Sequence, residues 1–154
     1  MTWKRGRGKL GIFDPLLGRW RAESESHMGK VACSRTFTKE LDGAYIQLTA
    51  DWEYEKGSYK EIALIGVGPE GKVNFWSFTS DKKQSRGYLA DVTDIHPDAI
   101  GFEAQMPAGL ARMAYWPDDT EGFHWAVESK TKKGWNRFTE HHYQAVSEAR
   151  YSAT

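Results

Sequence analysis

The sequence contains one cysteine, Cys33, and Lys+Arg and Asp+Glu both number 21. A single cysteine excludes an intrachain disulfide framework and a zinc or iron–sulfur site built from several cysteines. No apolar run approaches the about 18 residues of a membrane-spanning helix, and the first residues lack the apolar stretch of a signal peptide. The zero net charge gives no global reason to bind nucleic acid or an anionic membrane. We therefore expect a soluble, cytoplasmic protein with no nucleic-acid or membrane partner.

Aromatic residues and glycines are abundant. Aromatics make up 14% of the chain, with 7 Trp, and there are 15 Gly. Aromatic side chains suit the half-buried surface of a sheet, and glycines at regular intervals suit the turns between strands. The composition therefore favours an all-β protein of one domain, which we place at residues 12–147. We expect the basic residues 1–11 to form a disordered tail and residues 148–154 to form a C-terminal tail.

Residues 44–54 show the period of two that marks a strand with one buried face. Leu48 and Trp52 fall on one side of it, and Gln47 and Asp51 fall on the other. Similar extended segments follow one another along the chain, with turn residues between them. These segments are predicted at residues 19–26, 30–38, 44–54, 59–67, 73–79, 86–94, 100–106, 110–116, 123–129 and 135–146.

The connections between these segments have no helical pattern long enough for the crossover helices of a parallel sheet. A long antiparallel meander must either close or expose two edges, and closure leaves no edge unpaired. We therefore predict a closed antiparallel up-and-down β-barrel of about ten strands, preceded by a short helical turn at residues 15–17 with Asp14 as its cap. A barrel of this strand number is wider than side chains readily fill, so an interior cavity is expected.

The start of the first predicted strand, Gly18-x-Trp20 after two leucines, resembles the opening of the calycin superfamily, which includes lipocalins and fatty-acid-binding proteins. The resemblance implies that Trp20 closes one end of the barrel. It also implies that a basic residue of the last strand lies over the indole, and Arg137 is the matching residue here. A guanidinium on an indole face gains roughly 0.5–2 kcal/mol.

Two runs resemble more closely a family of uncharacterised, mostly bacterial lipocalin-like proteins. These runs are residues 17–20 (LGRW) and the later Gly66 with residues 74–76 (NFW). The order of elements agrees over about residues 13–147. The resemblance implies a closed barrel with a small-molecule cavity and no established reaction.

A more distant resemblance is to nitrobindin, a ten-stranded haem barrel whose proximal histidine lies near the C-terminus. Residues 139–142 (TEHH) occupy a comparable place, so the resemblance implies haem as a cofactor and His141 as its axial ligand. The chain departs from that family at residues 20–25 (WRAESE), where a glycine-rich run ending in Tyr-Pro would be expected. Haem therefore stays an alternative to a protein without a cofactor.

The alternation of the last predicted strand places Arg137, His141 and Tyr143 on one face. If Arg137 covers Trp20 inside the barrel, His141 and Tyr143 also point inward. The adjacent His142 then points outward, so the two histidines cannot share one interior metal ion. No metal site is predicted.

Alternation also selects the candidate ligand-binding residues of the cavity. Arg112 shares a face with Leu110 and Trp116, and a buried arginine needs an anionic partner, so we predict that it faces inward and binds a ligand carboxylate. The candidate lining residues are Leu48, Trp52, Trp76, Arg112, Trp125, His141 and Tyr143.

Motifs for catalysis are weak. The G-x-G-x-x-G match at residues 66–71 is followed by a strand and not by the helix that a dinucleotide site requires, so it is interpreted as a turn. His124 and Glu128 share a face opposite Trp125 and are interpreted as solvent-facing. No pattern of a nucleophile with its base appears, and Cys33 is interpreted as a small buried thiol. We therefore expect no enzyme activity.

The function that the residues favour is non-catalytic binding of a small, largely apolar ligand, with or without a carboxylate, inside the barrel. Two alternatives stay open. The first is a haem protein with His141 as axial ligand, and the second is a structural or assembly module whose interior is filled by its own side chains. A homodimer is also left open.

Overall fold

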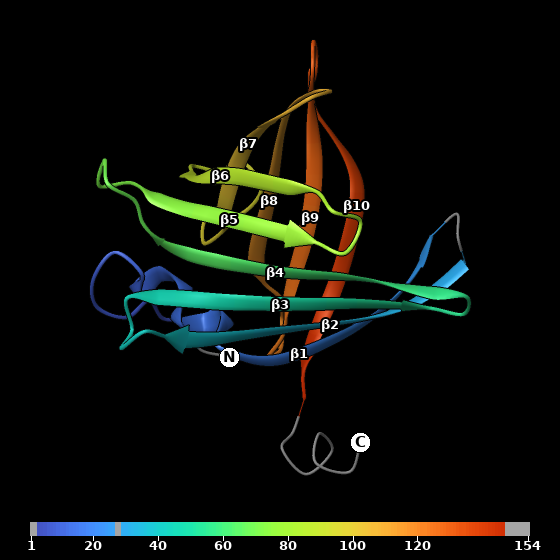
Figure 1. Ribbon diagram of the computed structural model, residues 1–154, viewed down its shortest axis with the longest axis horizontal. Coiled ribbons are helices and arrows are strands. Elements are labelled where there is room, and N and C mark those ends of the chain that lie inside the picture. The colour runs from blue at the N-terminus through green and yellow to red at the C-terminus, as the bar shows by residue number, and fades with distance from the viewer. Residues whose placement is uncertain (1–2, 27–28, 147–154) are drawn as a thin grey trace.

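The computed structural model describes residues 3–26 and 29–146, which form one closed antiparallel barrel (Figure 1). Each strand pairs with the next along the chain, and β1 pairs with β10 through Trp20 opposite Ala145. The predicted up-and-down barrel is therefore confirmed. Its elements are the 3-10 helix η1 (Gly11–Leu16) and the strands β1 (Gly18–Ser26), β2 (Gly29–Glu40), β3 (Tyr45–Tyr54), β4 (Gly57–Val67), β5 (Val73–Thr79), β6 (Gln84–Ala90), β7 (Ile100–Met106), β8 (Gly109–Pro117), β9 (Phe123–Thr131) and β10 (Gly134–Ala145).

The inner face of the barrel follows the alternation of the sequence in most strands. On β3 the buried residues are Ile46, Leu48 and Ala50, as the period of two predicts. On β9 Phe123 and Trp125 belong to the same interior cluster, while His124 lies on the outer face. Strand closure gives every such inner residue a cross-strand neighbour, so the core is continuous around the barrel.

Helix η1 closes one end of the barrel. Phe13 and Leu16 are fully buried, and the Phe13 ring stacks on Phe102 with centroids 5.7 Å apart. Burying each of these side chains is worth about 1.5–3 kcal/mol. The Trp20 indole Nε1 donates a hydrogen bond to the Leu16 carbonyl at 2.7 Å. The Trp20 and Phe123 rings pack in a T-shaped arrangement, with their centroids 4.8 Å apart. The helix begins at Gly11, four residues before the predicted turn.

Residues 3–10, which the sequence suggested as part of a disordered tail, contact the barrel. The Trp3 indole Nε1 donates to the Asp98 carbonyl at 3.1 Å, and Lys9 Nζ donates to the Gly71 carbonyl at 2.6 Å. Trp3 and Leu10 also pack against the core cluster. The apolar side chains within this basic segment explain the difference, because their burial offsets the cost of ordering the backbone.

Strand β6 ends at Ala90, so the predicted strand 86–94 is too long. Residues 91–99, here named the outer strap, turn away and cover the outside of the barrel. Val92 is fully buried and packs with Trp116 in a second apolar cluster on the outer wall. The outer strap lies close against β7 at Gly101. A Cβ atom added at Gly101 would lie only 2.7 Å from the Val92 side chain, so a residue without a side chain is needed there.

Strand β10 contains a β-bulge between Arg137 and Thr139. Arg137 pairs with Glu128 and Thr139 pairs with Val127, so Phe138 has no partner on β9. The extra residue changes which face the odd-numbered residues occupy. Arg137 therefore lies outside the barrel, and the prediction that it shares a face with His141 and Tyr143 is wrong.

Among the helices of the described residues, none is long and apolar enough to cross a membrane.

Candidate functional site

The barrel encloses a cavity of about 1770 Å³ that opens at the end opposite η1. The hairpins that follow β3, β5, β7 and β9 surround its mouth. The large apolar side chains of its wall include Trp52, Phe75, Phe102, Met113 and Trp125. This volume exceeds the common size of a small-molecule site, so side chains leave room for a ligand of considerable size.

Arg35 of β2 is the most unusual residue of this cavity wall. Its side chain is 2% exposed, and its guanidinium donates to two phenol oxygens, from Nη1 to Tyr115 at 2.8 Å and from Nε to Tyr143 at 3.3 Å. The guanidinium carbon also lies 4.2 Å from the Trp125 ring centroid. Within the described part of the chain, no carboxylate oxygen lies within 4.0 Å of it. Glu61 of the same cavity acts on this charge only from beyond ion-pair distance, so Arg35 has no direct ionic partner, and an anion that binds it directly is favoured.

Trp125 adds a second unused donor beside Arg35. In the described residues its indole Nε1 is the single buried side-chain nitrogen or oxygen without a hydrogen-bond partner. An unsatisfied buried N–H costs about 1–3 kcal/mol. This part of the cavity therefore has an excess of hydrogen-bond donors and attracts an acceptor group.

His141 lies deeper, between two indoles. Its ring centroid is 5.0 Å from Trp52 and 5.0 Å from Trp125. Its Nδ1 lies 3.1 Å from the Tyr143 hydroxyl, which accepts a hydrogen bond from Arg35. The other ring nitrogen, Nε2, lies 3.9 Å from Cys33 Sγ. Burial and then the Arg35 charge lower the pKa of His141 to about 4, so the ring is neutral at pH 7.

Cys33, like His141, is uncharged at pH 7. Its side chain is fully buried, and burial raises the pKa of its thiol to about 11. The thiol is therefore protonated at pH 7, and a thiol is a far weaker nucleophile than a thiolate. Cys33 and His141 together form a neutral contact and not an activated nucleophile with its base.

The surroundings of His141 do not fit an axial haem ligand. Such a ligand needs a ring nitrogen whose lone pair faces open space, and both nitrogens of His141 face protein atoms. The ring is also only 5% exposed. In residues 3–26 and 29–146, no group of three or more His, Cys, Asp or Glu side chains is placed to hold a metal ion.

Five of the predicted ligand-binding residues lie inside the barrel. Trp52 and Trp125 line the cavity. Leu48 and Tyr143 are fully buried and His141 nearly so, and these three pack toward the closed end without reaching the cavity surface. The predicted barrel-closing residue Trp20 lies at the closed end, but its cover is Phe123 and not Arg137.

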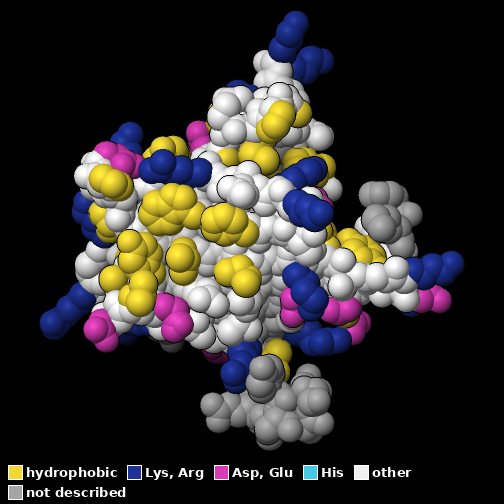
Figure 2. All heavy atoms as spheres, in the orientation of Figure 1, with side chains coloured by type: hydrophobic (Ala, Val, Ile, Leu, Met, Phe, Trp, Pro, Cys, Tyr) yellow, Lys and Arg dark blue, Asp and Glu magenta, His cyan; other side chains and the backbone are white. Residues whose placement is uncertain are grey.

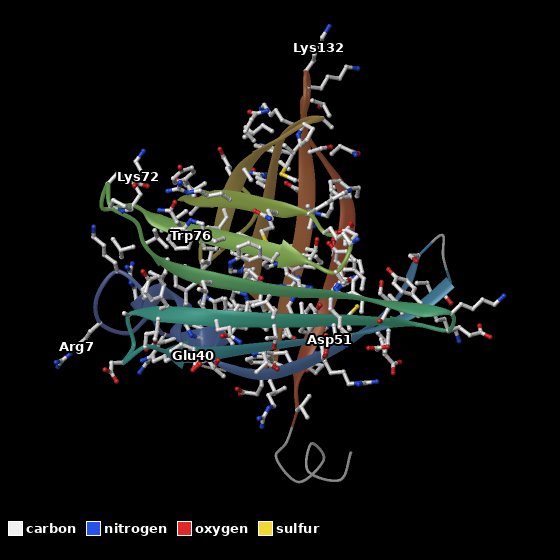
Figure 3. All side chains as sticks on the ribbon, in the orientation of Figure 1. Arg7, Glu40, Asp51, Lys72, Trp76 and Lys132 are labelled. Carbon is white, nitrogen blue, oxygen red and sulfur yellow. The ribbon has the colours of Figure 1, made fainter. Side chains whose placement is uncertain are left out.

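Trp76 faces outward. It lies on β5 (Figure 3), where the inner residues include Phe75 and Ser77, and its ring contacts Tyr45 and Arg86 on the outer wall. Hydrophobic side chains gather on this wall (Figure 2), and Ile62 and Phe78 are among the exposed ones. Because both faces of β5 carry aromatic residues, alternation cannot tell which face is the inner one.

Arg112 is one of the residues along the cavity wall, but its guanidinium is directed outward to protein carboxylates, so the prediction of an inward-facing side chain is wrong. Its guanidinium binds both carboxylate oxygens of Asp94 at 2.9 and 2.7 Å and one oxygen of Glu128 at 2.8 Å. The residues on either side of it, Ala111 and Met113, line the cavity. The apolar neighbours of Arg112 misled the prediction, because the outer strap buries this face and makes it resemble an inner one.

Arg137 completes this outer network. It donates to Glu128 at 2.9 Å and to Glu140 at 2.8 Å, and its guanidinium carbon lies 5.0 Å from the Trp116 ring centroid. The guanidinium carbon of Arg112 likewise lies 4.2 Å from the Trp135 ring centroid. The two arginines thus attach the outer strap and the start of β10 to β8 and β9.

The sequence contained an unused signal for Arg35. It alternates with Val31, Cys33 and Phe37, so an arginine occupies the apolar face of a predicted strand. Its partner Tyr115 and the acidic residue Glu61 of β4, which also lines the cavity, had no comparable signal. Their positions depend on which strands meet across the barrel.

Comparison with known proteins finds no protein-family model that matches this sequence and no significantly similar curated protein.

Proposed function

We propose that the protein binds a small, largely apolar acid inside the barrel, with the anionic group of the ligand at Arg35. The observation that carries this proposal is a buried guanidinium on the wall of a large cavity whose hydrogen-bond partners are neutral phenols and which has no direct ion pair. The open cavity argues against a module filled by its own side chains, and the likeness of Gly18-x-Trp20 to lipocalin-like proteins agrees with ligand binding. The neutral His141 and Cys33 favour binding without catalysis.

Binding would combine two contributions. Burying about 250 Å² of apolar ligand surface against the aromatic wall contributes roughly 6 kcal/mol before the entropy cost of association. A charge-assisted hydrogen bond from Arg35 adds about 1.5–3 kcal/mol, because the arginine is already desolvated before the ligand arrives. Tyr115 and Tyr143 hold the guanidinium in place, so little further ordering is needed on binding.

Calorimetric titration with dodecanoate and with the neutral dodecanol tests this proposal. Arg35→Met should weaken dodecanoate binding by about tenfold or more and leave dodecanol binding within about twofold, since only the acid uses the charge. Arg86→Ala is the matched control, because Arg86 lies on the outer wall beside Glu70 and Trp76. Equal dodecanoate affinity in the wild type and Arg35→Met, or no binding of either probe by the wild type, would contradict the proposal.

A further inference from the structure

We infer that Glu61 is a second ligand contact, so that the preferred ligand is an amphoteric molecule with an acid at Arg35 and a protonated amine at Glu61. This inference rests on the proposed function and specifies the chemical class of its ligand. It follows from two opposite charges on one cavity wall that form no direct ion pair and have neutral hydrogen-bond partners.

The two charged residues lie in one cross-strand row. Arg35 of β2 is opposite Ala50 of β3, and Ala50 is opposite Glu61 of β4. Their backbones are therefore two strand spacings apart, or about 9.5 Å. The residue between them is an alanine, whose small side chain leaves the space above it to the cavity. A ligand lying over Ala50 has Arg35 on one side and Glu61 on the other.

Each charge is directed to a different part of the barrel. Arg35 reaches across the interior to Tyr115 on β8 and Tyr143 on β10. Glu61 turns toward β5, where its Oε2 accepts a hydrogen bond from the Ser77 hydroxyl at 2.5 Å. Among the described residues, no Lys, Arg or His nitrogen lies within 4.0 Å of the Glu61 carboxylate. Glu61 thus has a neutral partner and an acceptor oxygen left for a ligand.

A purely apolar tail is a poor neighbour for this carboxylate. Covering Glu61 with hydrocarbon removes water from a charged group and returns no hydrogen bond, which is costly. A ligand ammonium group returns a charge-assisted hydrogen bond at the same place. The cavity wall therefore favours an acid that also carries a cationic nitrogen over a simple acid of equal length.

The experiment uses two probes of equal chain length, octanoate and 8-aminooctanoate. Calorimetric titration of the wild type should give tighter binding of 8-aminooctanoate than of octanoate. Glu61→Gln should lower the ratio of these two affinities by about tenfold, because the amide keeps the shape and loses the charge. Glu53→Gln, which removes the same charge from the outer face of β3, should leave the ratio unchanged.

Ser77→Ala is the control for a structural effect of losing the Ser77–Glu61 hydrogen bond, because it removes this bond and keeps the Glu61 carboxylate. This variant should retain the preference for 8-aminooctanoate. If octanoate binds in an Arg35-dependent way and Glu61→Gln leaves the ratio unchanged, the amphoteric ligand is refuted and the proposed function stands. If neither acid binds the wild type, the proposed function fails and this inference fails with it.

Discussion

The neutral His141 should make the protein lose stability in mild acid. The pKa of His141 is lowered from 6.5 to about 4 by burial and then by the Arg35 charge. The unfolded chain therefore takes up a proton on this ring as pH falls below 6.5, and the folded protein does not until pH approaches 4. Stability from this residue is present above pH 6.5 and is lost as pH falls from 6.5 to 4.

The size of the effect follows from the two pKa values. Between pH 7.5 and pH 4.5, linkage gives a loss of about 2.5 kcal/mol in the free energy of unfolding from His141 alone. His141→Phe removes the titrating group, and its ring occupies the same space between Trp52 and Trp125. The substitution also removes the contact with the Tyr143 hydroxyl and so lowers the free energy of unfolding at pH 7.5. At pH 4.5 this difference from the wild type should be smaller by about 2.5 kcal/mol, because only the wild type is destabilised by the titration of His141.

Urea unfolding at the two pH values measures this difference for the wild type and His141→Phe. Comparing the two proteins cancels the titration of all other groups, because only residue 141 differs. An NMR titration of the His141 ring provides an independent measurement and should show the ring less than about one-tenth protonated above pH 5. A difference between the two proteins that changes by less than about 0.5 kcal/mol from pH 7.5 to 4.5 would refute the assignment of a neutral, buried imidazole.

Two further predictions separate the outer network from the interior. Arg112→Met should destabilise the fold by roughly 1.5–3 kcal/mol, because the buried Glu128 loses one of its two charged hydrogen-bond partners and keeps Arg137. Its dodecanoate affinity should stay within about twofold of the wild type, and a tenfold loss would show that Arg112 reaches the ligand. The Cys33 thiol, whose pKa burial raises to about 11, should resist iodoacetamide at pH 8 in the folded protein and react after unfolding in urea. Rapid alkylation of the folded protein, followed by mass spectrometry, would contradict its burial.

The strand order and the closure of the barrel could be predicted from local patterns. Residues 44–54 alternate cleanly because β3 has one apolar and one polar face, and the turn residues on each side mark its ends. Short connections then leave antiparallel pairing as the available topology, and the pairing of β1 with β10 removes both edges. Each of these inferences needs only neighbouring residues in the chain.

The face of a strand that turns inward could be predicted only where one face is polar. On β8 the outer strap buries the side that carries Arg112, so both faces of that strand are largely apolar. On β5 aromatic residues occupy both faces, and Trp76 was placed on the wrong one. Alternation tells which residues share a face, but it cannot tell whether that face meets the barrel interior or a covering segment.

The sequence by itself thus determined ten strands, their order and a hollow barrel, because these features depend on local propensity and the pairing of successive strands. Tertiary structure alone decided the bulge at Phe138, which moved Arg137 away from Trp20, and the convergence of Tyr115 and Tyr143 on Arg35. The physical reason is that one extra residue reverses the side-chain alternation beyond it. Likewise, contacts across the interior join strands that are far apart in the chain.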